Sequence, residues 1–243
     1  MDHIKAIEWC GNGRGFTVEI SLAERPNAPT AMSAPDPTVK TPDETANSGC
    51  GAMPCSAVGK VRWPRAAGLE VAKELCNRLK PCCEQLIVAG SLRRRKADVG
   101  DVEILYVSRM ESRPFDMFST VSVSLAEEEI ARMLADGTLT KRPSKVGGTA
   151  WGDKNKLAVH RSGMPVDLFR TVSESWWNYL VCRTGPADSN TRIATEAQRK
   201  GYRWNPYGAG FTCLADGKIT TMDSEESVFA FVGLPYLEPW TRK

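Results

Sequence analysis

The chain has 243 residues, a length that allows one or two domains with a full hydrophobic core. Its 42% hydrophobic and 25% charged residues are typical of a globular protein, and no apolar run approaches the roughly 18 residues of a membrane span. The start, Met1 to Lys5, has no signal-peptide pattern. We therefore expect no membrane partner and an intracellular protein, in the cytoplasm of a cell or of a virus's host.

The net charge of +3 is small, but basic residues cluster along the chain. Residues 1–60 hold five Lys/Arg against seven Asp/Glu, so the excess of positive charge lies after them. Arg93 to Lys96 form one basic run, and a second cluster spans residues 141–161. A phosphate-rich partner explains such clusters, and so does an ordinary solvated face. Charge alone does not separate the two.

The first 60 residues read as a hairpin and a Pro-rich segment. Residues 4–9 and 16–22 have strand character around a Gly-rich turn at 11–15. From about residue 25 to residue 60, Pro, Ala, Ser, Thr and Gly replace any periodic pattern, which predicts a flexible segment. We expect the folded part to begin near Val61.

The rest of the chain predicts an α+β fold, with a mixed β-sheet flanked by helices and a small C-terminal α/β subdomain. The expected domains are 61–172 and 173–243. Helical spacing of apolar residues runs from Leu69 to Leu79. A capping box at Ser124 opens a further helix that closes at Gly137. Strands are expected at 86–89, 102–107, 138–142, 156–160 and 164–169, and helices at 173–181, 188–200 and 223–233.

The segment from Gly90 to Glu103 carries the most specific chemical signal. It leaves a strand as Gly90-Ser91, crosses the basic turn, and enters the next strand as Gly100-Asp101-Val102-Glu103. Glycine lets a phosphate approach the backbone, and a nearby hydroxyl and arginines bind its oxygens. Residues two apart on a strand face the same side, so Asp101 and Glu103 project together. Carboxylate oxygens gathered in this way are the ligands that Mg²⁺ prefers.

Asp167 supplies a third acid from the predicted strand at 164–169. A single aspartate at a strand is more often structural, but together with Asp101 and Glu103 it completes a triad. Such a triad would hold two Mg²⁺ ions, with Mn²⁺ as a substitute, for in-line phosphoryl transfer. We therefore interpret Asp101, Glu103 and Asp167 as both the metal ligands and the catalytic residues.

These motifs resemble the nucleotide-binding signature of family X DNA polymerases, in the nucleotidyltransferase superfamily. Further likeness comes from Val181-Cys182-Arg183-Thr184-Gly185, from Asn190, from Lys200-Gly201-Tyr202 and from Gly233-Leu234-Pro235-Tyr236. The resemblance covers roughly residues 62–240 and is similar to compact phage and bacterial members without the lyase domain. It implies a palm that carries the metals and a thumb-like subdomain that closes over the nucleotide.

The resemblance also implies partners and further site residues. The partners would be a DNA primer-template or gapped DNA and a dNTP, with the chain acting as a monomer in short-gap repair synthesis. Asp167 would activate the primer 3′ hydroxyl, and Ser91 and Arg94 would hold the β and γ phosphates. The full set of expected nucleotide-binding residues is Gly90, Ser91, Arg94, Gly100, Thr184, Gly185 and Asn190. Expected DNA contacts are Lys141, Lys145, Lys156 and Arg192, for which ordinary surface charge is the alternative.

Three points stay open at this level. Cys182-Arg183 stands where relatives often carry an aromatic pair that crowds the sugar, so we expect weak selection of dNTP over NTP, with Arg183 free to swing outward. A nucleotidyltransferase acting on RNA, a protein or a small molecule is one alternative. A catalytically silent DNA-binding relative is the other.

Overall fold

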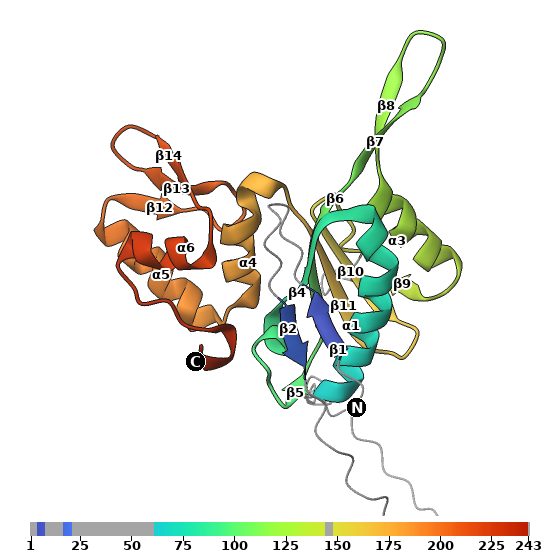
Figure 1. The fold of residues 1–243 in the computed structure, drawn as a ribbon, viewed down its shortest axis with the longest axis horizontal. Helices are drawn as coiled ribbons and strands as arrows, with labels where there is room; N and C mark the ends of the chain where they lie inside the picture. Colours follow the sequence, from blue (N-terminus) through green and yellow to red (C-terminus); the bar gives the residue numbers. More distant parts are fainter. Residues whose placement is uncertain (1–3, 8–16, 21–60, 144–147, 243) are drawn as a thin grey trace, which may run out of the picture.

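The computed structural model describes residues 4–7, 17–20, 61–143 and 148–242. Within these ranges the chain forms two lobes, which lie side by side in Figure 1. The sheet lobe runs from β3 to β11, and the C-terminal lobe runs from α4 to the last 3₁₀ turn. In the first 60 residues, β1 (Ile4–Ile7) pairs antiparallel with β2 (Thr17–Ile20), as the predicted hairpin requires. The predicted turn and Pro-rich segment lie outside the described residues.

A five-stranded mixed sheet with the order β4-β6-β11-β10-β9 forms the sheet lobe. β6 and β11 are parallel, and the other neighbouring strands are antiparallel. The predicted α+β fold with a mixed sheet is confirmed. The strands of this sheet are β4 (Cys83–Val88), β6 (Val102–Ser108), β9 (Leu139–Lys141), β10 (Asn155–His160) and β11 (Pro165–Arg170).

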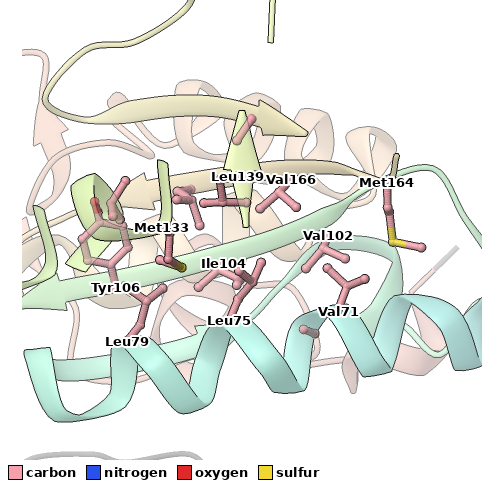
Figure 2. Packing of buried hydrophobic residues seen from close by; sticks show 14 of the residues in the cluster. Val71, Leu75, Leu79, Val102, Ile104, Tyr106, Met133, Leu139, Met164 and Val166 are labelled. Carbon is pink, nitrogen blue, oxygen red and sulfur yellow. The ribbon is translucent and has the colours of Figure 1, made fainter. Parts of the chain in front are cut away.

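Two helices cover one face of this sheet. Helix α1 (Arg65–Leu79) buries the predicted stripe at Ala72, Leu75 and Leu79, and α3 (Leu125–Ala135) begins where the Ser124 side chain accepts a hydrogen bond from the Glu127 N–H. Figure 2 shows their side chains packed against the strands. Because side chains alternate along a strand, Val102, Ile104 and Tyr106 of β6 point into this core. The cluster is almost wholly aliphatic.

Shorter elements connect these layers. Two of them form a hairpin that projects from the sheet lobe in Figure 1, and sequence patterns did not predict it, because its side chains are mostly exposed and do not alternate. The shorter elements are β3 (Trp63–Pro64), a 3₁₀ turn (Lys80–Cys82), α2 (Gly90–Arg93), β5 (Asp98–Val99), β7 (Met110–Pro114) and β8 (Thr120–Ser124).

Helix α4 belongs to both lobes. It follows a 3₁₀ turn at Ser173–Ser175 and runs from Trp176 to Thr184. Trp176, Tyr179 and Leu180 pack on the second face of the sheet, while Val181 packs in the core of the C-terminal lobe. The carbonyl end of α4 therefore lies at the junction of the two lobes.

The C-terminal lobe combines two further helices with a three-stranded antiparallel sheet of order β12-β13-β14. The sequence predicts an α/β subdomain but does not locate these strands, because they are only three or four residues long. Helix α6 begins at the N-cap Ser224 and ends at Gly233, whose φ of 78° favours glycine. The elements are α5 (Ala187–Arg199), β12 (Tyr202–Trp204), β13 (Gly210–Cys213), β14 (Ile219–Thr221), α6 (Glu225–Val232) and a 3₁₀ turn (Pro239–Thr241).

None of the helices in the described ranges is long and apolar enough to cross a membrane. The cysteines that the structure describes, Cys76, Cys82, Cys83, Cys182 and Cys213, are free thiols.

Candidate active site

The predicted acids come together on the face of the sheet that α4 covers. Glu103 of β6 lies directly opposite Asp167 of β11 in the parallel register. Both alternate with residues of the aliphatic core, so both point to the second face, as Leu105 and Phe169 do. Asp101 precedes β6 by one residue and has the same parity as Glu103. The strand pairing thus brings all three predicted acids to one place beside the C-terminal lobe.

The pKa of Glu103 reflects the other two carboxylates beside it. Burial and, after it, the negative charges of Asp101 and Asp167 raise the pKa of Glu103 to about 7, although Arg183 and Arg94 oppose the shift. Such a shift records the free-energy cost of gathering negative charge in a partly buried space. A cation placed among these carboxylates would remove that cost.

The donor set suits a hard divalent cation, because every group in it is a carboxylate. In the part of the chain that the structure describes, no group of three His, Cys, Asp or Glu side chains is arranged to hold a metal ion. One of the three acids is paired with an arginine, because Arg142 Nη2 lies 2.6 Å from Asp167 Oδ1. The residues therefore fit a metal site in their chemistry, while Asp167 is paired with Arg142 in this structure.

The turn after β4 lies against the acids. Gly90 has a φ of 61°, and a Cβ at this position would overlap the Glu103 carboxylate. Glycine is therefore required both by the backbone and by the close approach. The Ser91 Oγ is buried and has no hydrogen-bond partner within the described residues, so it is ready to bind an added oxygen atom. Gly100 is buried immediately before Asp101.

The basic side chains of this turn reach the C-terminal lobe. Arg94 donates from Nη1 to the Thr184 carbonyl, and Arg93 donates from Nη1 to Thr184 Oγ1 at 2.7 Å. Gly185 follows with a φ of 62°, and a Cβ there would lie only 3.2 Å from Arg94 Nη1. The expected nucleotide-binding residues of the two lobes are therefore in contact.

Asn190 lies in the first turn of α5. Its Nδ2 donates to the Cys182 carbonyl at 2.9 Å, and its Oδ1 is buried without a hydrogen-bond partner in the described ranges. The Asn190 side chain therefore binds the last turn of α4, and its Oδ1 can accept a hydrogen bond from a bound ligand.

The expected DNA contacts divide into three groups. Lys141 and Arg192 are exposed, and Lys145 lies outside the described residues. The prediction for Lys156 is wrong: it is only 4% exposed, and its Nζ lies 2.8 Å from Glu127 Oε2 and 3.0 Å from the Gly152 carbonyl. Because β10 turns this side chain toward α3, its charge neutralises Glu127 inside the protein and is not offered to DNA.

The expectation that Arg183 swings outward is also wrong. Its guanidinium lies 3.6 Å from the centre of the Phe169 ring and 5.4 Å from that of Tyr207. Tyr207 also hydrogen-bonds to the Cys182 thiol. Burial raises the pKa of this thiol, while the Arg183 charge and the bond with Tyr207 oppose the rise. Sequence reasoning missed Tyr207 because it comes from the turn between β12 and β13, more than twenty residues away.

Comparisons with known proteins bear on the fold and on the C-terminal lobe. The family model described as the DNA polymerase beta thumb matches residues 179–243. A crystal structure of Leishmania infantum polymerase beta, described as a ternary P/T complex, is similar with a TM-score of 0.60 and 18% identity, over 75% of this chain and 77% of that chain. A search of curated proteins found no match.

The chain therefore has the nucleotidyltransferase fold of polymerase beta, and its C-terminal part matches the polymerase beta thumb. The resemblance to family X DNA polymerases that the sequence motifs indicate is confirmed.

Proposed function

We propose that this protein is a DNA polymerase of the family X type, which adds dNMP from dNTP to a DNA 3′ hydroxyl in short-gap repair synthesis. The observation that carries the proposal is the gathering of Asp101, Glu103 and Asp167 on the sheet face beside a polymerase beta type of thumb. The neighbouring Ser91 and Arg94 supply a hydroxyl and a guanidinium for the phosphates.

Asp101, Glu103 and Asp167 would hold two Mg²⁺ ions, or Mn²⁺ in their place. When bound, these ions would stabilise the negative charge that develops on the attacking and leaving oxygens. The protein's own groups would do the remaining work. Asp167 would accept the proton of the 3′ hydroxyl as the new phosphodiester bond forms and pyrophosphate leaves.

The residues at the junction of the lobes would position the nucleotide. The buried Ser91 Oγ would hydrogen-bond to a phosphate oxygen, and Arg94 would add a charge-assisted bond. The contacts of Arg93 and Arg94 with Thr184 tie this phosphate site to the thumb. Binding of a triphosphate would therefore act on the C-terminal lobe through the contacts of Arg93 and Arg94 with Thr184.

Primer extension tests the proposal. A labelled DNA primer is offered single-stranded, on a template and at a one-nucleotide gap, with dNTPs or NTPs and with Mg²⁺ or Mn²⁺. We expect extension of the templated and gapped substrates by the templated dNTP. DNA binding without any incorporation would favour a catalytically silent DNA-binding protein. Transfer only to RNA, a protein or a small molecule would favour a nucleotidyltransferase that acts on another acceptor.

A further inference from the structure

A buried ionic cluster of Arg93, Glu225 and Arg242 joins the two lobes. Arg93 binds the Glu225 carboxylate through both terminal nitrogens, at 2.6 and 2.9 Å. Arg242 reaches the same carboxylate from the other side, with Nη2 3.1 Å from Oε1. All three side chains are at most 13% exposed. Two guanidinium groups thus share the buried carboxylate of Glu225.

Arg242 also keeps an unused donor. Its side chain has no exposure to solvent, its Nε donates to the Leu237 carbonyl at 2.8 Å, and its Nη2 binds Glu225. Its Nη1 is buried and has no hydrogen-bond partner among the described residues. A buried, charged N–H group without a partner is unfavourable, so this position is suited to an added acceptor.

A cavity of about 200 Å³ in the C-terminal lobe is lined by Arg242. Arg192 and Ser189 of α5 line it as well, and so do the apolar side chains of Phe229 and Leu234. No acidic side chain is among its lining residues. Sites for drug-sized ligands usually measure about 300–1,000 Å³, so this cavity suits one small group and not a whole nucleotide.

We propose that this cavity binds a single phosphate group. Arg242 Nη1 and the Arg192 guanidinium would donate charge-assisted hydrogen bonds to the phosphate oxygens, and the Ser189 hydroxyl would add a third donor. The bound anion would give the buried Arg242 guanidinium a second acceptor beside Glu225. The residues differ from those of the nucleotide site at Ser91 and Arg94, and the proposal does not rest on polymerase activity.

Calorimetric titration of inorganic phosphate into the full chain tests the proposal, in a chelator-containing buffer at constant ionic strength set with NaCl. We expect saturable binding that Arg192→Ala weakens at least roughly tenfold, the loss of about one charge-assisted hydrogen bond. Ser189→Ala should weaken it by less. Arg192 is exposed, so these variants are expected to fold, and thermal unfolding checks this.

Two controls make the result specific. Arg199→Ala removes an exposed arginine of the same helix that does not line the cavity, and it should leave phosphate binding unchanged. Ser91→Ala should leave the event that depends on Arg192 in place, even if a second event disappears. The absence of saturable binding, or binding that Arg192→Ala does not weaken, would overturn the proposal. Neither result would bear on primer extension, which requires metal and DNA.

The dependence of DNA affinity on salt identifies the source of the phosphate. If a DNA strand supplies it, Arg192→Ala should reduce the slope of log K against log [NaCl] by about one, while Arg199→Ala leaves the slope unchanged. If Arg192→Ala leaves the slope unchanged and still abolishes binding of inorganic phosphate, a free phosphate is the ligand.

Discussion

The two lobes are stabilised in different ways. The sheet lobe has an almost wholly aliphatic core, with its functional carboxylates on the opposite face of the same strands. The C-terminal lobe has a smaller core with stacked aromatic rings, of which Phe211 and Phe231 lie 4.4 Å apart, and it holds the buried carboxylate of Glu225. The first lobe thus supplies a platform for the acids, and its link to the second combines the apolar packing of α4 on the sheet with the buried ion pairs of Glu225.

The largest expected loss of stability comes from the ionic link. Glu225→Gln would leave Arg93 and Arg242 buried without their shared carboxylate. Removing one partner of a buried ion pair typically costs about 3–5 kcal/mol. Urea unfolding at pH 7 measures this, and a loss below about 1 kcal/mol would show that the link is not important for stability.

The same link makes the stability depend on pH. Burial raises the pKa of Glu225, but the charges and hydrogen bonds of Arg93 and Arg242 outweigh this and hold its pKa below the ordinary 4.5. A lowered carboxylate pKa contributes stability that is fully present above pH 4.5 and is lost as the pH falls through the folded-state value. The difference between wild type and Glu225→Gln should therefore shrink below pH 4.5, and a constant difference would contradict this assignment.

The aliphatic core provides the matched contrast. Leu75 is fully buried in the sheet lobe, and Leu75→Ala should cost about 2–5 kcal/mol through the cavity that it leaves. Because no charge is involved, urea unfolding should give the same loss at pH 4 and at pH 7. A loss that varies strongly with pH would remove the distinction between the lobes.

The junction of the lobes should affect the choice of sugar. Arg183 is fixed among aromatic rings, and Tyr207 lies against both Arg183 and Cys182, so this site is more rigid than its sequence suggests. We expect Tyr207→Ala to lower the preference for dNTP over NTP by roughly 10-fold, and Tyr207→Phe to lower it less. Ratios of kcat/KM for matched dNTP and NTP pairs measure this, and an unchanged ratio in Tyr207→Ala would exclude a role for the ring.

Two lysines of neighbouring strands give the smallest expected effects. Lys141→Ala should reduce the salt slope of DNA binding by about one and leave stability unchanged, because Lys141 is exposed. Lys156→Met should leave that slope unchanged and lower stability by about 1–3 kcal/mol, because it removes the buried partner of Glu127. A salt slope that falls in Lys156→Met and stays unchanged in Lys141→Ala would instead identify Lys156 as a DNA contact.

Local patterns predicted most of the sheet lobe and the position of its acids. The helical stripe of α1, the strands around Glu103 and Asp167, and the period of two between Asp101 and Glu103 are all properties of short segments. What the sequence did not reveal depends on pairing between distant segments. Lys156 meets Glu127, Tyr207 meets Arg183, and Glu225 meets Arg93 across 132 residues of chain, and no spacing rule indicates such contacts.

The most direct test of the central claim is extension of a gapped DNA primer by wild type, Asp101→Asn and Asp167→Asn, with DNA affinity measured in parallel. The account assigns both acids to the metal site, so each variant should lose at least about 100-fold in the rate of nucleotide addition while retaining its affinity for DNA. Extension by either variant at a rate near that of wild type would contradict the assignment of the triad.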